Sequence, residues 1–209
     1  MERVPEVIVR KARGSRRKGF VLDRLEAEEA REVLGRLLAA HPDLRAEAER
    51  HARSLMGEVT FEAIADEVED SVNAFDLDDL NGRAGKHTWG YVEPNEAAWE
   101  ILEEAVEPFV SDLKRQIELG LEPEALEICK GIMLGLYRAE HGKEGELAQW
   151  APDFPAEAAG NALQTWLTGD SLGKVPRRKG LAFPQDFVER FVPEWRDMIV
   201  RLSSRKRGR

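Results

Sequence analysis

The sequence predicts an all-α protein, an array or bundle of about six to eight helices in antiparallel pairs. Apolar residues recur at helical spacing in successive segments of roughly 12–20 residues, and glycine or proline marks most segment ends. No segment shows the convincing alternation of apolar and polar residues that a half-buried strand requires. With 209 residues, the chain is long enough to bury one substantial core.

The charges describe an acidic body with two basic ends. Hydrophobic residues make up 42% of the chain, charged residues 34%, and the formal net charge is −9, which argues against a general nucleic-acid binder. Residues 1–24 carry eight Arg or Lys against three Asp or Glu, and residues 195–209 carry six against one. The remainder therefore sums to about −19.

The chain lacks the apolar runs of a signal peptide or a membrane span. Cys129 is the only cysteine, which excludes an intramolecular disulfide and a zinc site built from several thiolates. We expect a bacterial protein of the reducing cytoplasm, without membrane contact.

Three parts are expected along the chain: a basic arm at 1–19, a single helical domain at 20–203 and a basic tail at 204–209. A division of the domain into lobes 20–92 and 93–203 is an alternative. The arm contains no apolar periodicity and supplies the candidate nucleic-acid contacts, which are Arg10, Lys11, Arg13, Arg16, Arg17 and Lys18. Such residues could neutralise several phosphates, or instead fold back onto the acidic body or remain solvated.

Three helices are predicted before residue 76. The first starts with a capping-box-like pair, Asp23 and Glu26, and places Val33, Leu34 and Leu37 on one face before it stops at residues 41–42. The second covers about 43–56, with Gly57 as the stop. In the third, Thr60 is the N-cap of an amphipathic helix that extends to Phe75.

The later helices are marked by prolines and glycines. Pro94 suits the first position of a helix that ends at Gly120, and Pro108 predicts a kink or break inside it. The segment 122–137 is apolar on nearly all sides, which marks the central buried helix; Gly131 and Gly135 would let a neighbouring helix approach closely. Two further helices are expected at about 155–167 and from Pro184 to Leu202, the last one bent at Pro193.

The stretch DLDDLNGRAGKHTWGY, residues 76–91, is the strongest candidate for a functional loop. An EF-hand register with Gly82 at position 6 places Leu77 at position 1 and Thr88 at position 12, where carboxylates are required. A P-loop register places Leu80 at the first glycine and His87 at the hydroxyl position. Both chemistries are therefore excluded at this loop.

A packed connection explains more of this stretch. Asp76 is expected to cap a single helical turn at 77–80, with Asn81-Gly82 as a left-handed exit and with Arg83, Lys86 and His87 neutralising the aspartates. A long, ordered loop is also a common place for a ligand or partner site. The candidate residues are Asp76, Asp78, Asp79, Asn81, Arg83, Lys86, His87, Trp89 and Tyr91.

No catalytic residue is predicted. The chain has no HExxH and no Glu-x-x-His, so no metal ligand set and no cofactor are predicted. Cys129 is expected in the core. A carboxylate face on the third helix is expected to meet water, with binding of a divalent cation or a basic partner as the alternative; it consists of Glu62, Asp66, Glu69 and Asp70.

Three passages resemble uncharacterised prokaryotic all-helical proteins: DLDDLNGRAGKHTWGYVEP, EAAWEILEEAVEPFVSDLKRQIELGL and EICKGIMLGLYR. The resemblance implies no activity and no catalytic residue. The antiparallel helical pairs also resemble tetratricopeptide or HEAT arrays, without their regular consensus.

The function favoured by the sequence is a non-enzymatic protein-interaction module, which meets a protein through an acidic groove or through the 76–91 loop. One alternative is a nucleic-acid-associated factor that uses the basic ends. The other is a metal-dependent enzyme that uses carboxylates near residues 62–79.

Overall fold

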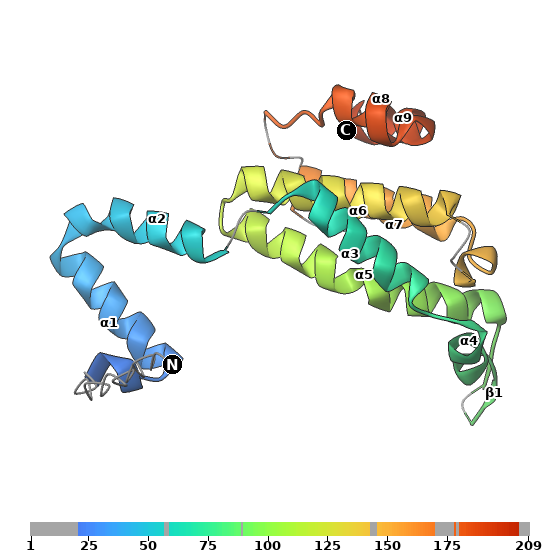
Figure 1. Cartoon of the computed structure of the whole chain (residues 1–209), viewed down its shortest axis with the longest axis horizontal. Coiled ribbons are helices and arrows are strands. Elements are labelled where there is room, and N and C mark those ends of the chain that lie inside the picture. The colour runs from blue at the N-terminus through green and yellow to red at the C-terminus, as the bar shows by residue number, and fades with distance from the viewer. Residues whose placement is uncertain are drawn as a thin grey trace, which may run out of the picture. The chain divides into compact units, whose positions relative to one another are not determined.

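The computed structural model is all-α and describes residues 21–56, 59–88, 90–142, 146–169, 178 and 180–204. Nine α-helices and one small two-stranded sheet lie in these ranges, which confirms the predicted fold class (Figure 1). Contacts divide the chain into two compact units, 1–57 and 58–209. The position between residues 92 and 93 falls inside the second unit. No helix in the described ranges combines the length and the apolar character needed to cross a bilayer.

The first unit contains two short 3₁₀ segments and two α-helices. They are η1 (Val21–Arg24), α1 (Ala27–Ala40), η2 (Pro42–Leu44) and α2 (Arg45–Met56). The capping box at the start of α1 is formed by Glu26 and Glu29, so the helix begins later than the Asp23 start predicted from sequence. Among the side chains of this unit that the structure describes, none is buried.

The second unit begins with α3 (Phe61–Asn73), and Thr60 caps it as predicted, because its side chain accepts a hydrogen bond from the Ala63 amide. The helix α4 (Leu77–Arg83) and the antiparallel pair β1 (Gly85–His87) and β2 (Gly90–Val92) follow. The hairpin was not predicted, since two strands of three residues are too short to show an alternating pattern.

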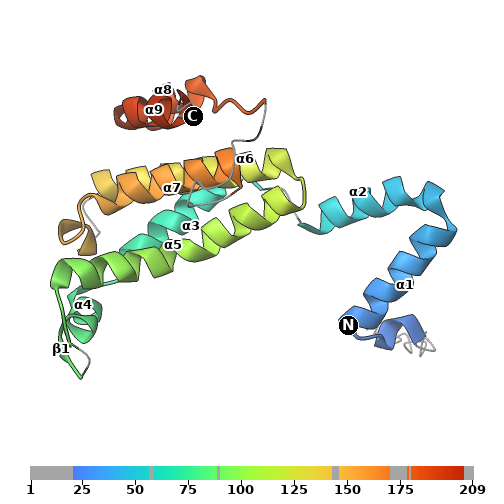
Figure 2. The same ribbon diagram turned by 180° about the vertical axis from the view of Figure 1, so that it is seen from behind.

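Three long helices form the body of the second unit: α5 (Pro94–Glu118), α6 (Glu122–His141) and α7 (Phe154–Thr168). Figures 1 and 2 show them lying along one another with α3. The predicted break at Pro108 does not occur, because α5 continues through it. Pro108 is exposed, so the carbonyl group that loses its helical partner there can face water. A short 3₁₀ segment, η3 (Leu147–Gln149), precedes α7.

The C-terminal helix is divided rather than bent. The segments are α8 (Gln185–Phe191), η4 (Pro193–Trp195) and α9 (Arg196–Ser204). Val192 adopts φ −137° and ψ 51°, outside the helical region, since the residue before a proline is pushed out of it. The expectation of one continuous helix was therefore wrong.

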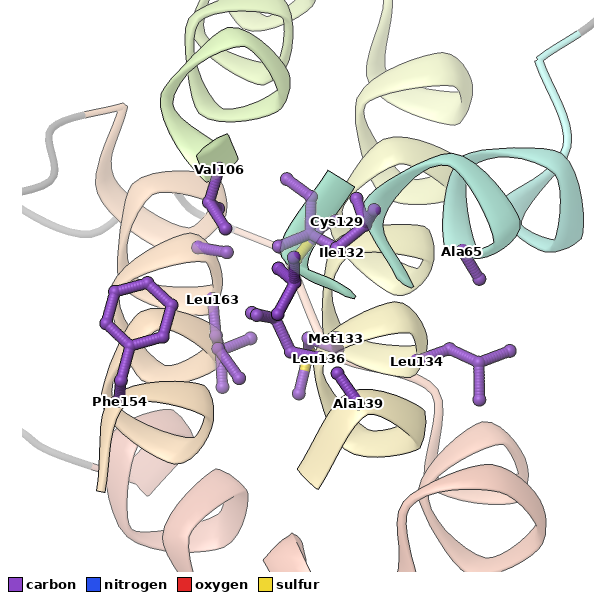
Figure 3. Packing of buried hydrophobic residues seen from close by; sticks show 14 of the residues in the cluster. Ala65, Val106, Cys129, Ile132, Met133, Leu134, Leu136, Ala139, Phe154 and Leu163 are labelled. Atoms are coloured by element: carbon purple, nitrogen blue, oxygen red, sulfur yellow. The ribbon is translucent and has the colours of Figure 1, made fainter. Parts of the chain in front are cut away.

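Helix α6 is the centre of the core, as the sequence predicted. Its side chains pack against α3, α5 and α7, and Figure 3 shows Ile132, Met133 and Leu136 beside Leu163 of α7. The ten buried residues of α6 are Ala125, Ile128, Cys129, Gly131, Ile132, Met133, Leu134, Gly135, Leu136 and Ala139.

The two α6 glycines permit a close contact between α3 and α6. A Cβ atom added to Gly131 would lie 2.5 Å from the Ile64 Cβ, and one added to Gly135 would lie 2.6 Å from the Ala65 carbonyl oxygen. Both distances are well below van der Waals contact. The predicted close approach at these glycines is confirmed.

We expect Gly135→Ala to destabilise the second unit by about 1–3 kcal/mol, because the methyl group forces the helices apart. Gly160→Ala in α7 is the matched control, since its Cβ would lie 3.5 Å from the Leu202 side chain. That substitution should be neutral or stabilise by up to about 1 kcal/mol. Urea unfolding measures both changes, and equal stability of the two variants would contradict the account of this contact.

Candidate functional site

The 76–91 stretch is an ordered helix and hairpin. The Asp76 carboxylate accepts hydrogen bonds from the amides of Asp78 (2.8 Å) and Asp79 (3.1 Å). In return, the Asp79 carboxylate accepts one from the Asp76 amide at 3.1 Å. This capping box confirms Asp76 as an N-cap. It also means that two of the three aspartates are engaged in local backbone contacts.

The predicted exit at Asn81-Gly82 is wrong. Both residues lie inside α4, which continues to Arg83. The positive φ angles occur later, at Gly85 (104°) and Gly90 (154°), where the chain enters β1 and where it enters β2. The Asn-Gly pair resembled a helix stop in sequence, but Leu80 is buried, and this anchor favours continuation of the helix.

Arg83 does not neutralise the aspartates of the loop. Its guanidinium donates two hydrogen bonds to the two oxygens of Glu104 on α5, each 2.9 Å long, and lies 3.9 Å from Glu100. Hydrogen bonding to Glu104 raises the pKa of Arg83, and the same bonds lower the pKa of Glu104. The bidentate pair therefore fixes α4 to α5.

The other candidate residues of the stretch are dispersed. Asn81 and Lys86 are exposed, and Tyr91 is 63% exposed on β2. A ring nitrogen of His87 lies 2.8 Å from the Arg83 carbonyl oxygen, which it satisfies inside the loop. Trp89 lies outside the described residues.

A hollow of about 430 Å³ nevertheless lies beside α4, the hairpin and α5. Among its described lining residues, the one aliphatic side chain is Val92, whereas sites for small molecules are lined mostly by apolar groups. The Arg83 guanidinium in this lining is already paired with Glu104 and lies near Glu100. The described residues that line it are Asp79, Gly82, Arg83, His87, Val92 and Glu100.

The carboxylate face of α3 meets an arginine. Arg138 of α6 lies 2.7 Å from Asp66 and 3.5 Å from Glu69, whereas Glu62 and Asp70 are exposed. Within the described ranges, no group of three or more His, Cys, Asp or Glu side chains is placed to hold a metal ion. The face thus connects α3 to α6 in addition to meeting solvent.

Cys129 lies in the core, as predicted from sequence. Its side chain is fully buried, and burial raises the pKa of its thiol. A thiol that stays protonated is a poor nucleophile and a poor metal ligand.

A groove lies along α5 and α7 in the described part of the chain. Its floor is apolar, and the edge-to-face pair of Trp99 and Phe154, with ring centroids 5.2 Å apart, lies in it. Glu103 and Glu107 form an acidic rim. The described residues that line it are Trp99, Glu103, Val106, Glu107, Val110, Lys114, Phe154, Ala158 and Asn161.

This groove has a volume of about 200 Å³, which is below the roughly 300–1,000 Å³ of typical small-molecule sites. The sequence predicted the helix that carries Val106 and Val110 but did not indicate the groove. The interleaving of Glu103 and Glu107 with these valines was the available signal. The α7 residues of the groove are brought beside α5 by tertiary packing, so no local sequence pattern indicates them.

A second feature without a sequence signal surrounds His141 at the end of α6. One ring nitrogen lies 2.8 Å from the Tyr137 carbonyl oxygen, and the other lies 3.1 Å from a Glu194 carboxylate oxygen. Both partners are acceptors, so only the doubly protonated ring donates to both. The ring stacks on Tyr137, whose other neighbour is Trp195.

The environment of His141 favours its charged form. The hydrogen bond to the Tyr137 carbonyl, followed by the contact with Glu194, raises the pKa of His141 against the opposing effect of burial. Burial raises the pKa of the neighbouring Glu140 carboxyl. The imidazole connects the C-terminal end of α6 to η4, 53 residues later.

The basic candidates of the termini cannot be placed. Residues 10–18 and 205–209 lie outside the described part of the chain, so the predicted nucleic-acid contacts stay predictions.

No protein-family model matches this chain, and no curated protein or solved structure matches it. The resemblance to uncharacterised prokaryotic helical proteins and to tetratricopeptide or HEAT arrays therefore stays a prediction as well.

We expect the stability of the protein to fall as the pH rises through the folded-state pKa of His141. The unfolded pKa is about 6.5, and the folded value is raised above it. The stabilisation is thus fully present below about pH 6.5 and is lost above the folded value. Thermal unfolding between about pH 6 and 8.5 should show a smaller pH dependence for His141→Gln than for the wild type.

His51→Gln is the control for this measurement, because the His51 side chain is 75% exposed on α2. That variant should keep the wild-type pH dependence. Identical pH dependence in the wild type and in His141→Gln would show that the His141–Glu194 contact does not stabilise the fold.

Proposed function

We propose that this chain is a non-enzymatic helical interaction module and that the groove along α5 and α7 binds a protein partner. The observation that carries the proposal is the combination of an apolar floor with an acidic rim on a face of two adjacent long helices. Residues of α5 at positions 99, 103, 106, 107, 110 and 114 follow helical spacing along the groove. This spacing suits an amphipathic helix laid along them.

The size of the groove supports a protein ligand. About 200 Å³ is small for a metabolite but suits a few anchoring side chains of a partner, which carry most of the energy in a typical interface. Trp99 and Val110 are half-buried, so each retains apolar surface for such contacts.

The rim indicates the chemistry of the partner. Glu103 and Glu107 are exposed at one edge, and Lys114 lies 3.9 Å from Glu107 near one end. The net negative rim favours a helix with an apolar stripe and a flanking Lys or Arg. Complementary charge raises the rate of association and excludes acidic competitors.

The two alternatives receive less support. A metal-dependent enzyme requires a ligand set near residues 62–79, and in the described ranges the carboxylates there cap α4, contact Arg138 or face solvent. A nucleic-acid-associated factor depends on basic termini that lie outside the described residues.

We expect Asn161→Trp to block the groove and to lower partner binding at least tenfold, which corresponds to about 1.4 kcal/mol. Asn161 is an exposed rim residue, so its replacement leaves the core intact. The tagged protein is used for affinity capture from its native cell extract, and captured proteins are compared by quantitative mass spectrometry. A captured protein is then purified, and its dissociation constant is measured with each variant.

Glu67→Trp is the control, because Glu67 is exposed on α3 and does not line the groove. A partner of the groove binds the wild type and Glu67→Trp but not Asn161→Trp. Equal capture of every protein by both variants would remove the groove from the proposal. Reproducible turnover in a metabolite screen, abolished by a substitution at Asp78 or His87, would overturn the non-enzymatic assignment.

A further inference from the structure

Helix α1 of the first unit carries a partly exposed apolar stripe. Val33, Leu34 and Leu37 are 41%, 48% and 45% exposed, and Leu38 beside them is half-buried. At 100° per residue these four side chains occupy one side of the helix. None of them is buried within the unit to which the helix belongs.

The first unit needs a cover for this stripe. Its helices have 14 and 12 residues, and isolated helices of this length are only marginally stable in water. The capping box and the exposed ion pairs Arg31–Glu28 and Arg36–Glu32 contribute little, since surface pairs are weak. Most helical stability in proteins comes from packing an amphipathic face.

We propose that the stripe is covered by the α1 helix of a second copy of this chain, in an antiparallel pair about a two-fold axis. The proposal concerns a different surface from the α5–α7 groove and does not depend on it. In a two-fold interface, if residue i of one copy contacts residue j of the other, then residue j of the first copy also contacts residue i of the second. The axis would pass near Val33, so that Leu37 and Leu38 of each copy would lie over the Ala27–Ala30 end of the same face of the other copy.

The charges beside the stripe complement themselves in this arrangement. Glu29 and Arg36 are seven residues apart and so lie along the same edge of the helix. An antiparallel pair brings Glu29 of each copy towards Arg36 of the other, at both ends of the interface. The Arg36 guanidinium already contacts Glu32 but has five N–H donors in total.

The overall charge of α1 also permits self-association. The segment Ala27–Ala40 contains two arginines and three glutamates, so two copies do not repel strongly. This helix has no large net charge that would attract a strongly charged partner of opposite sign. A second copy therefore satisfies both the apolar stripe and the mixed charges at its edge.

Sedimentation velocity of the full-length chain over about 1–100 µM tests the proposal. The wild type should form a dimer, and Leu34→Glu should weaken it at least tenfold by placing charge in the stripe. Ala39→Glu is the matched control, because Ala39 is exposed on the opposite side of α1; it should dimerise like the wild type. A wild-type chain that stays monomeric, or a dimer that Leu34→Glu leaves unchanged, overturns the proposal.

A cysteine cross-link tests the same interface without disturbing helix stability by charge. Cys129 is the only native cysteine and is fully buried. An introduced surface thiol is therefore the one that is accessible for disulfide cross-linking. Mild oxidation should link Val33→Cys into a covalent dimer and leave Ala39→Cys monomeric. Failure of Val33→Cys to cross-link faster than Ala39→Cys, or the appearance of larger oligomers, rules out the antiparallel two-fold pair.

Discussion

The close packing of α3 on α6 is the constraint on which the rest of the second unit depends. Gly131 and Gly135 remove the side chains that would separate the two backbones, so Ile64 and Val68 of α3 reach the surface of α6. With α3 so close on one side, and α5 and α7 on others, α6 is buried along most of its length. Its nearly continuous apolar character follows from this position.

The same packing determines where polar chemistry can lie. Because α6 occupies the centre, the carboxylates of α3 and α5 are turned outward, where they meet Arg138 and Arg83 or line the groove rim. At the C-terminal end of α6, His141 contacts Glu194 of η4. The candidate partner surfaces therefore lie on the outer helices and on α1, while the only cysteine is enclosed.

Local signals in the sequence predicted much of this fold. Thr60, Asp76 and Pro94 each begin a helix through their own side chain or ring, and two glycines on an apolar helix indicated a close neighbour. The features that were missed depend on distant residues: Arg83 pairs with Glu104, and His141 with Glu194. Buried Leu80 likewise overrode the Asn81-Gly82 stop signal, and no local pattern specifies which α7 residues complete the groove.

Residue-resolved native-state hydrogen exchange tests most directly the claim that α6 and its contact with α3 organise the second unit. Amides exchange slowest where opening requires global unfolding. The account predicts that the amides from Ile128 to Leu136 exchange last, together with the facing turns of α3. Earlier exchange of these amides than of those in α5 or α7 would contradict it.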